Sequence, residues 1–140
     1  MTTISSFMSA DHDRLDALMA QARAADDPPG AADSFAEFTT GLLTHIEWEE
    51  GILFPVFEER TGMSDAGPTA VMRMEHEQIR RLLDAGRVPS GRDEFARIAV
   101  ELASLLAMHN RKEELILYPW MDRELTADQI AQAFQRMRAS

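Results

Sequence analysis

The sequence predicts an all-α protein: an up-down-up-down four-helix bundle with a short C-terminal fifth helix. Two observations lead to this fold. Apolar residues recur with helical periodicity along almost the whole chain, and strand-like alternation is nearly absent. Short segments rich in proline, glycine and aspartate separate the long periodic stretches, and short loops join antiparallel neighbours in a bundle. At 140 residues, the chain is long enough for one domain and too short for two.

The first two helices meet at a proline-rich break. The first helix is expected to begin between residues 4 and 9 and to end near residue 25, because residues 26–30 read Asp-Asp-Pro-Pro-Gly. Ser34 followed by Glu37 has the pattern of a capping box, which predicts that the second helix begins there.

The remaining helices follow from similar signals. Pro68 suits the first turn of a third helix, and residues 86–91 form a short connection to a fourth helix that begins near Asp93. Thr126 is expected to cap the short fifth helix, which ends near Arg138.

Further expectations concern two apolar residues and two prolines within the long helices. Val71 and Ile116 fall on the apolar pattern and are expected to face the core. Pro55 and Pro119 fall late in long helices, where proline removes a backbone hydrogen bond and clashes with the carbonyl four residues earlier. We expect a kink or an early stop at each proline, although both could simply end their helices.

The composition excludes several classes of function. With no cysteine, the chain has neither disulfides nor thiolate metal sites. A formal net charge of −10 argues against a nucleic-acid partner, because phosphate binding needs a basic surface. No apolar run is long enough to span a bilayer and no secretory signal is visible, so a cytoplasmic protein without membrane contact is expected.

An internal repeat carries every histidine in the chain. A shift of 64 residues places His12 on His76 and His45 on His109. The same shift places Glu49 on Glu113, so that each half reads His, then His-x-x-x-Glu. Two matching sets of imidazole and carboxylate groups suggest two metal ions related by an approximate two-fold axis.

The spacing and surroundings of these residues favour metal binding. Residues four apart lie on one face of a helix, so each His-x-x-x-Glu pair can aim at one point inside the bundle. A single such pair is usually a solvated surface pair, but these pairs lie among apolar residues, where unpaired polar groups are costly. Zinc would accept four ligands, whereas a bridged pair with an open position favours iron. The predicted metal ligands are His12, His45, Glu49, His76, His109 and Glu113.

The chain resembles the hemerythrin-like proteins of the HHE cation-binding family. The resemblance rests on an acidic-His turn in helices one and three, on His-x-x-x-Glu-Glu-x-x-x-Phe-Pro at residues 45–55, and on His-x-x-x-Glu-Glu-x-x-x-Tyr-Pro at residues 109–119. It implies a non-haem centre of two iron ions with an oxo or hydroxo bridge. The four histidines are then terminal ligands, and Glu49 and Glu113 bridge the ions.

The sequence departs from two known branches of that family. Oxygen-carrying hemerythrins have a fifth histidine where this chain has Arg80, and an aspartate five residues after the last histidine, where this chain has Glu113 four residues after. The di-iron repair proteins of nitrosative stress carry a cysteine-containing segment, and this sequence has no cysteine. Because Arg80 replaces a ligand, each metal is expected to keep an exchangeable position.

We therefore expect a protein that binds dioxygen or nitric oxide for sensing, storage or detoxification. Two alternatives remain open. One is redox catalysis, namely reduction of peroxide or nitric oxide or donation of iron to damaged iron centres. The other is an iron-sensing module that acts on an unidentified protein partner. Around the site, Arg80 could pair with Asp16 or extend into solvent, Glu50 and Glu114 could be solvated or lie behind the ligands, and Trp48 and Tyr118 could pack near the centre.

Overall fold

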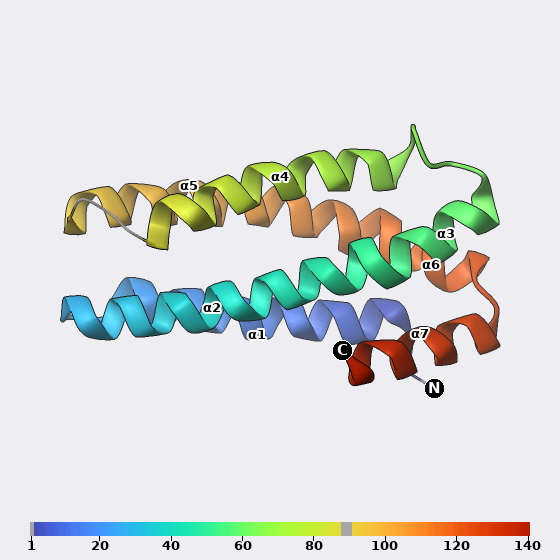
Figure 1. Cartoon of the computed structure of the whole chain (residues 1–140), viewed down its shortest axis with the longest axis horizontal. Coiled ribbons are helices and arrows are strands. Elements are labelled where there is room, and N and C mark those ends of the chain that lie inside the picture. The colour runs from blue at the N-terminus through green and yellow to red at the C-terminus, as the bar shows by residue number, and fades with distance from the viewer. Residues whose placement is uncertain (1, 88–90) are drawn as a thin grey trace.

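The computed structural model describes residues 2–87 and 91–140 and confirms the predicted all-α bundle. Figure 1 shows four long antiparallel helical rods, with a short helix packed beside one end of the bundle. The second and fourth rods each contain a π-helical turn, η1 or η2, between two α-helices. Within the described ranges there is no strand. The elements are α1 (Ile4–Ala24), α2 (Pro28–Trp48), η1 (Glu49–Leu53), α3 (Phe54–Thr61), α4 (Pro68–Arg87), α5 (Arg92–Lys112), η2 (Glu113–Leu117), α6 (Tyr118–Glu124) and α7 (Ala127–Ala139).

The predicted start of the second helix at Ser34 is wrong. Helix α2 begins at Pro28, and the carboxylate of Asp27 caps it by accepting a hydrogen bond from the Gly30 amide at 2.8 Å. Proline is tolerated in the first turn because its missing N–H has no partner there in any helix. The segment that looked like a helix break is therefore a helix start. The predicted connection at residues 86–91 is shorter, since α4 runs through Arg87, and residues 88–90 lie outside the described ranges.

The two late prolines neither stop nor break their helices. Each follows a π-helical turn, in which the Phe54 amide bonds to the Glu49 carbonyl and the Tyr118 amide bonds to the Glu113 carbonyl, five residues back. The extra residue in the turn accommodates the proline ring without ending the rod. Pro55 has no N–H to donate to the Gly51 carbonyl. That carbonyl accepts a hydrogen bond from Arg136 of α7 at 3.4 Å.

Two hydrophobic clusters lie on either side of a polar layer in the bundle. One cluster is near α7 and includes Phe54, Phe57 and Met121; the other is nearer the opposite end and includes Phe38 and Leu102. Apolar side chains therefore enclose the polar layer on both sides along the bundle.

The expectation that Val71 and Ile116 are buried is wrong, since they are 39% and 56% exposed. Val71 lies one residue before the buried face of α4, which carries Met72. Ile116 has Ile52 as its equivalent in the repeat, and Ile52 is buried in η1, against which α7 packs. The two halves of the repeat thus differ in what covers them. None of the described helices is both long enough and apolar enough to cross a membrane.

Asp122 of α6 ties the start of α1 to the bundle. Its carboxylate accepts hydrogen bonds from the Ile4 and Ser5 amides at 2.8 and 3.0 Å, and these amides have no partner within their own helix. We expect Asp122→Ala to lower the free energy of unfolding by about 1–2 kcal/mol in urea denaturation. The exposed Asp33, replaced by alanine, is the control and should change stability by less than about 0.5 kcal/mol. Equal effects of the two substitutions would contradict the assignment.

Candidate metal centre

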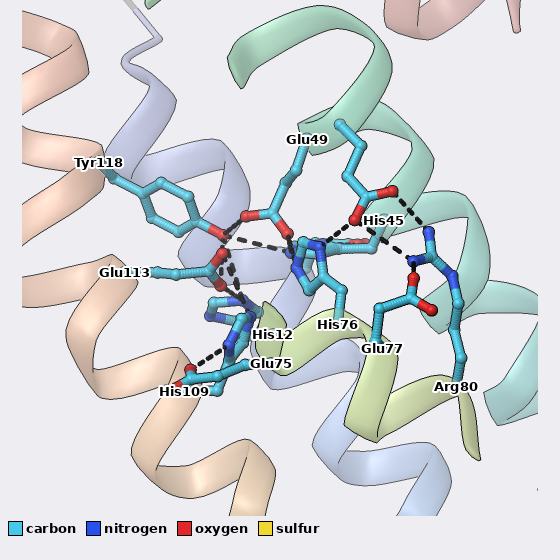
Figure 2. A network of polar contacts seen from close by, with 12 residues as sticks. His12, His45, Glu49, Glu75, His76, Glu77, Arg80, His109, Glu113 and Tyr118 are labelled. Carbon is cyan, nitrogen blue, oxygen red and sulfur yellow. Dashed lines mark hydrogen bonds and ion pairs between the residues drawn. The ribbon is translucent and has the colours of Figure 1, made fainter. Parts of the chain in front are cut away.

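All six predicted site residues converge in the polar layer between the two hydrophobic clusters. His12, His45 and His76 come from α1, α2 and α4, and His109 comes from α5. Glu49 and Glu113 come from the two π-helical turns. Each of the six residues is at most 3% exposed. Figure 2 shows their side chains pointing toward one another from all four rods.

The two carboxylates lie between the four imidazoles. Glu113 directs one oxygen to His12 Nε2 at 3.2 Å and the other oxygen to His109 Nε2 at 3.4 Å. Glu49 directs a single oxygen, Oε1, to His76 Nε2 at 3.2 Å and to His45 Nε2 at 3.8 Å. Within the described residues, two groups of donor atoms are close enough together to hold a metal ion, and Glu113 belongs to both groups.

Every histidine of the cluster has a carboxylate behind it. His45 Nδ1 lies 2.8 Å from Asp11, and His109 Nδ1 lies 2.8 Å from Glu75. Because an ionised carboxylate can only accept, each Nδ1 must carry the hydrogen. The other ring nitrogen, Nε2, then keeps its lone pair toward the centre whenever the ring is neutral. This is the arrangement of histidines that bind metals in proteins.

The other two histidines follow the same rule across the repeat. His12 Nδ1 lies 2.6 Å from Glu114, and His76 Nδ1 lies 2.7 Å from Glu50. The shift of 64 residues exchanges these two pairs, as it exchanges the Asp11–His45 and Glu75–His109 pairs. Of the two roles open to Glu50 and Glu114, the structure shows the one behind the histidines.

Arg80 pairs with Glu50 rather than with Asp16. Its guanidinium donates to Glu50 Oε1 and to Glu77 Oε1, both at 2.6 Å, and Figure 2 shows it on the side of His76 away from the cluster. Burial raises the pKa of the Glu50 carboxyl, but His76 and Arg80 outweigh it and lower the pKa to about 2. Glu50 therefore stays ionised and fixes the orientation of His76.

The sequence indicates only that Tyr118 could pack near the centre. Its hydroxyl lies among the ligand candidates, 2.7 Å from Glu49 Oε2 and 3.0 Å from Glu113 Oε1. Burial and the two carboxylates raise the pKa of Tyr118 well above its usual value, so the hydroxyl keeps its proton. The equivalent residue in the repeat is Phe54, whose ring stacks on that of His76. This Tyr/Phe difference between otherwise matching motifs was the signal available in the sequence.

The cluster suits a cation because several of its buried atoms have no hydrogen-bond partner. Among the described residues, Glu49 Oε1, His76 Nε2 and Glu113 Oε2 are such atoms. Although His76 Nε2 and Glu49 Oε1 are 3.2 Å apart, they are not aligned for a hydrogen bond. Leaving polar atoms buried and unpaired costs about 1–3 kcal/mol each, and a metal ion bound to these atoms removes that cost.

Protons compete with a cation for these sites. Burial lowers the pKa of His12 and His76, but the neighbouring glutamates outweigh burial and raise each pKa to about 9. Burial raises the pKa of Glu113, but its contacts with Glu49, His109 and His12 outweigh burial and lower that pKa well below its usual value. Without a metal, His12 and His76 therefore hold protons at neutral pH that a metal must displace.

The sequence matches the family model described as the hemerythrin HHE cation binding domain, over residues 3–121. The chain belongs to this hemerythrin family. The matched range includes all six residues of the cluster and Tyr118, and leaves out α7. Membership in a cation-binding family and the buried His/Glu cluster together support a metal-binding function.

Two curated relatives resemble this hemerythrin-like chain. It is 26% identical to a DNA nickase of Nostoc sp. (strain PCC 7120), over 93% of this chain and 36% of that protein. It is 34% identical to the iron-sulfur cluster repair protein YtfE of Cronobacter sakazakii, over 41% of this chain and 28% of that protein. The chain thus spans about a third or less of the length of these relatives. No solved structure matches it.

The raised histidine pKa values predict a pH effect on the metal-free protein. A group whose pKa is higher in the folded state stabilises the fold fully below its unfolded pKa, about 6.5 for histidine, and loses that effect as the pH rises through the folded value. His12 and His76 have folded pKa values of about 9. The free energy of unfolding of metal-free protein should therefore fall between about pH 6.5 and 9. Denaturant titrations across this range should show the fall, and His12→Phe should reduce it.

The same protons should be released when a metal binds. Calorimetric titrations of Fe²⁺ or Zn²⁺ at pH 7, in buffers of different ionisation enthalpy, count the protons released. We expect a net release, because histidines that carry protons in the metal-free protein must be neutral to bind. No proton release would contradict the protonated state of His12 and His76.

Removing a carboxylate that lies behind a histidine should weaken metal binding, although that carboxylate is not itself a predicted ligand. Asp11→Ala removes the group that orients His45 without touching the cluster, and should weaken metal binding by about 10–100-fold in competition with a chelator. The exposed Glu47 lies on the same helix as His45, and Glu47→Ala is the control that should leave the affinity unchanged. Unchanged affinity in the Asp11 variant would show that His45 is not a ligand.

Proposed function

We propose that this protein is a non-haem di-iron protein that binds a small diatomic ligand, dioxygen or nitric oxide. The observation that carries the proposal is the set of four histidines that each have Nδ1 held by a carboxylate and Nε2 facing Glu49 or Glu113. His12, His45, His76 and His109 would be the terminal ligands of the two ions, and Glu49 and Glu113 would be shared between them.

The shape of the cluster supports two ions rather than one. Glu113 presents separate oxygens to histidines on two different rods, α1 and α5, as a carboxylate shared between two ions requires. Imidazole nitrogen mixed with carboxylate oxygen is a donor set suited to iron. When bound, the two ions supply the electrons and the open coordination for reaction with a small oxidant.

Tyr118 favours a second candidate function, reductive turnover of peroxide or nitric oxide. A protonated hydroxyl among the ligand candidates can donate a hydrogen bond, or its proton, to negative charge that develops on a bound molecule. Hydrogen-bond donors beside a metal help to decide whether a bound molecule is stored or turned over. The similarity to an iron-sulfur cluster repair protein supports a third role, the transfer of iron to damaged centres.

We expect variants of the shared glutamates and of the histidines to differ in metal content. Glu113→Ala should lose most of both ions, since the residue serves two positions, whereas His109→Ala should lose mainly one. Metal analysis by mass spectrometry on protein whose helical content is checked by circular dichroism measures this, with Glu47→Ala as the control. One ion or fewer in fully loaded wild-type protein refutes the di-iron centre.

The role of Tyr118 can be separated from metal binding. Tyr118→Phe should keep both ions but slow the reaction of the reduced protein with peroxide or nitric oxide by about 100-fold in stopped-flow spectroscopy. The matched control is Phe54→Tyr, which adds a hydroxyl at the equivalent position of the other half. An unchanged rate in Tyr118→Phe, together with spectra that return to the reduced form when oxygen is removed, would favour oxygen storage over turnover.

A further inference from the structure

A cavity is lined by residues of α1, α2, α4 and α5 and of the connection between α1 and α2. Figure 1 shows that this connection lies at the end of the bundle opposite α7. The volume of the cavity is about 800 Å³, within the range of pockets that hold small molecules in proteins. The helices that line it contribute none of the six metal-centre residues to its wall. A ligand bound in this cavity would therefore contact none of the six metal-centre residues that line the cluster.

Small side chains leave this space open. Seven alanines from α1, α2 and α5 and the connection between α1 and α2 line the cavity, together with Gly86 of α4. Gly86 is packed against the ring of Phe35, where an added Cβ would lie only 2.6 Å from the ring. Phe35 and Phe95 supply the aromatic part of the wall. Their rings meet edge to face, with the ring centroids 5.3 Å apart. The wall is thus mainly apolar and partly open to solvent, and the cavity has room for a hydrocarbon chain.

The polar groups at this cavity have the opposite charge balance to the whole chain. Among the residues that the structure describes, its lining includes Arg23, Arg87 and Arg92 but only one acidic residue, Asp27. The chain as a whole has 14 basic and 24 acidic residues. The Asp27 carboxylate is already bonded to the Gly30 amide as the cap of α2.

The contacts seen at Arg87 and Arg92 within the described part of the chain do little to neutralise their charge. Arg92 donates to a backbone carbonyl, that of Asp26, at 2.5 Å, which leaves its charge uncompensated by that contact. Arg87 is 3.8 Å from Asp84, and both side chains are more than 60% exposed, so that pair contributes little. Guanidinium groups at the edge of an apolar cavity fit a carboxylate attached to a hydrocarbon chain.

We propose that this cavity binds a linear amphipathic carboxylate of the fatty-acid class. The hydrocarbon chain lies between the alanines and the two phenylalanines, and the carboxylate lies at the arginines. The proposal rests on the cavity and its charges, and does not depend on the metal or on the function proposed above.

Calorimetric titration of decanoate into the metal-loaded protein, below the micellar concentration, tests the proposal. Affinity should rise about threefold to fourfold for each methylene added from hexanoate to decanoate. Decyltrimethylammonium, with the same chain and the opposite charge, should bind at least about tenfold more weakly. Equal affinity for the two head groups, or affinity independent of chain length, overturns the proposal.

Matched variants locate the binding. Ala31→Phe fills the cavity from α2 and should weaken decanoate binding by about tenfold or more, whereas Ala24→Phe, an exposed position outside the lining, should not. Arg87→Ala combined with Arg92→Ala should weaken binding by about tenfold, and the control pair Arg81→Ala with Arg97→Ala should have little effect. Equal effects of test and control variants overturn the assignment.

The metal content and the oxidation kinetics of each variant provide an independent check. They should match those of the wild type, because the cavity and the metal centre share no residue. Analytical ultracentrifugation tests the other possible occupant. If the wild type is a dimer that Ala31→Phe converts to a monomer, a second copy of the chain covers the cavity and the fatty-acid proposal is overturned.

Discussion

The hydrogen bond from each histidine Nδ1 to a carboxylate is the interaction on which the centre depends. It fixes the tautomer, the ring orientation and the direction of the remaining lone pair in one contact. The four carboxylates belong to rods different from those of their histidines, as with Glu75 of α4 behind His109 of α5. The contacts that orient the site therefore also hold the rods in register.

Burial makes this polar layer costly and at the same time useful. Two ionisable carboxylates and four imidazoles lie between two hydrophobic clusters, where unpaired charge is strongly disfavoured. A bound cation relieves that cost, and protons on His12 and His76 relieve part of it without a cation. The stability of the bundle and the occupancy of its centre are therefore thermodynamically linked, so that conditions that remove metal also alter the fold's response to pH.

The bundle was predictable from the sequence because it follows from local spacing, and the structure brings the six predicted site residues together. Helical period places His45 and Glu49 on one face, and the repeat supplies the other half. Two features that the sequence missed depend on tertiary context. Ile116 is exposed because α7 packs on the other half, and Arg80 pairs with Glu50 across two helices. Neither arrangement lies within one helical turn of its residue. The π-helical turn before Pro55 is local, but a proline does not by itself specify a backbone hydrogen bond that spans five residues.

The difference between Tyr118 and Phe54 bears on why one chain carries both halves. Two identical subunits around a two-fold axis would have to place the same side chain at both positions. A tandem repeat in a single polypeptide escapes that constraint, so one half can present a hydroxyl to the centre while the other half presents only a ring. The repeated chain thereby combines the geometry of a symmetric assembly with two halves of the cluster that are chemically distinct.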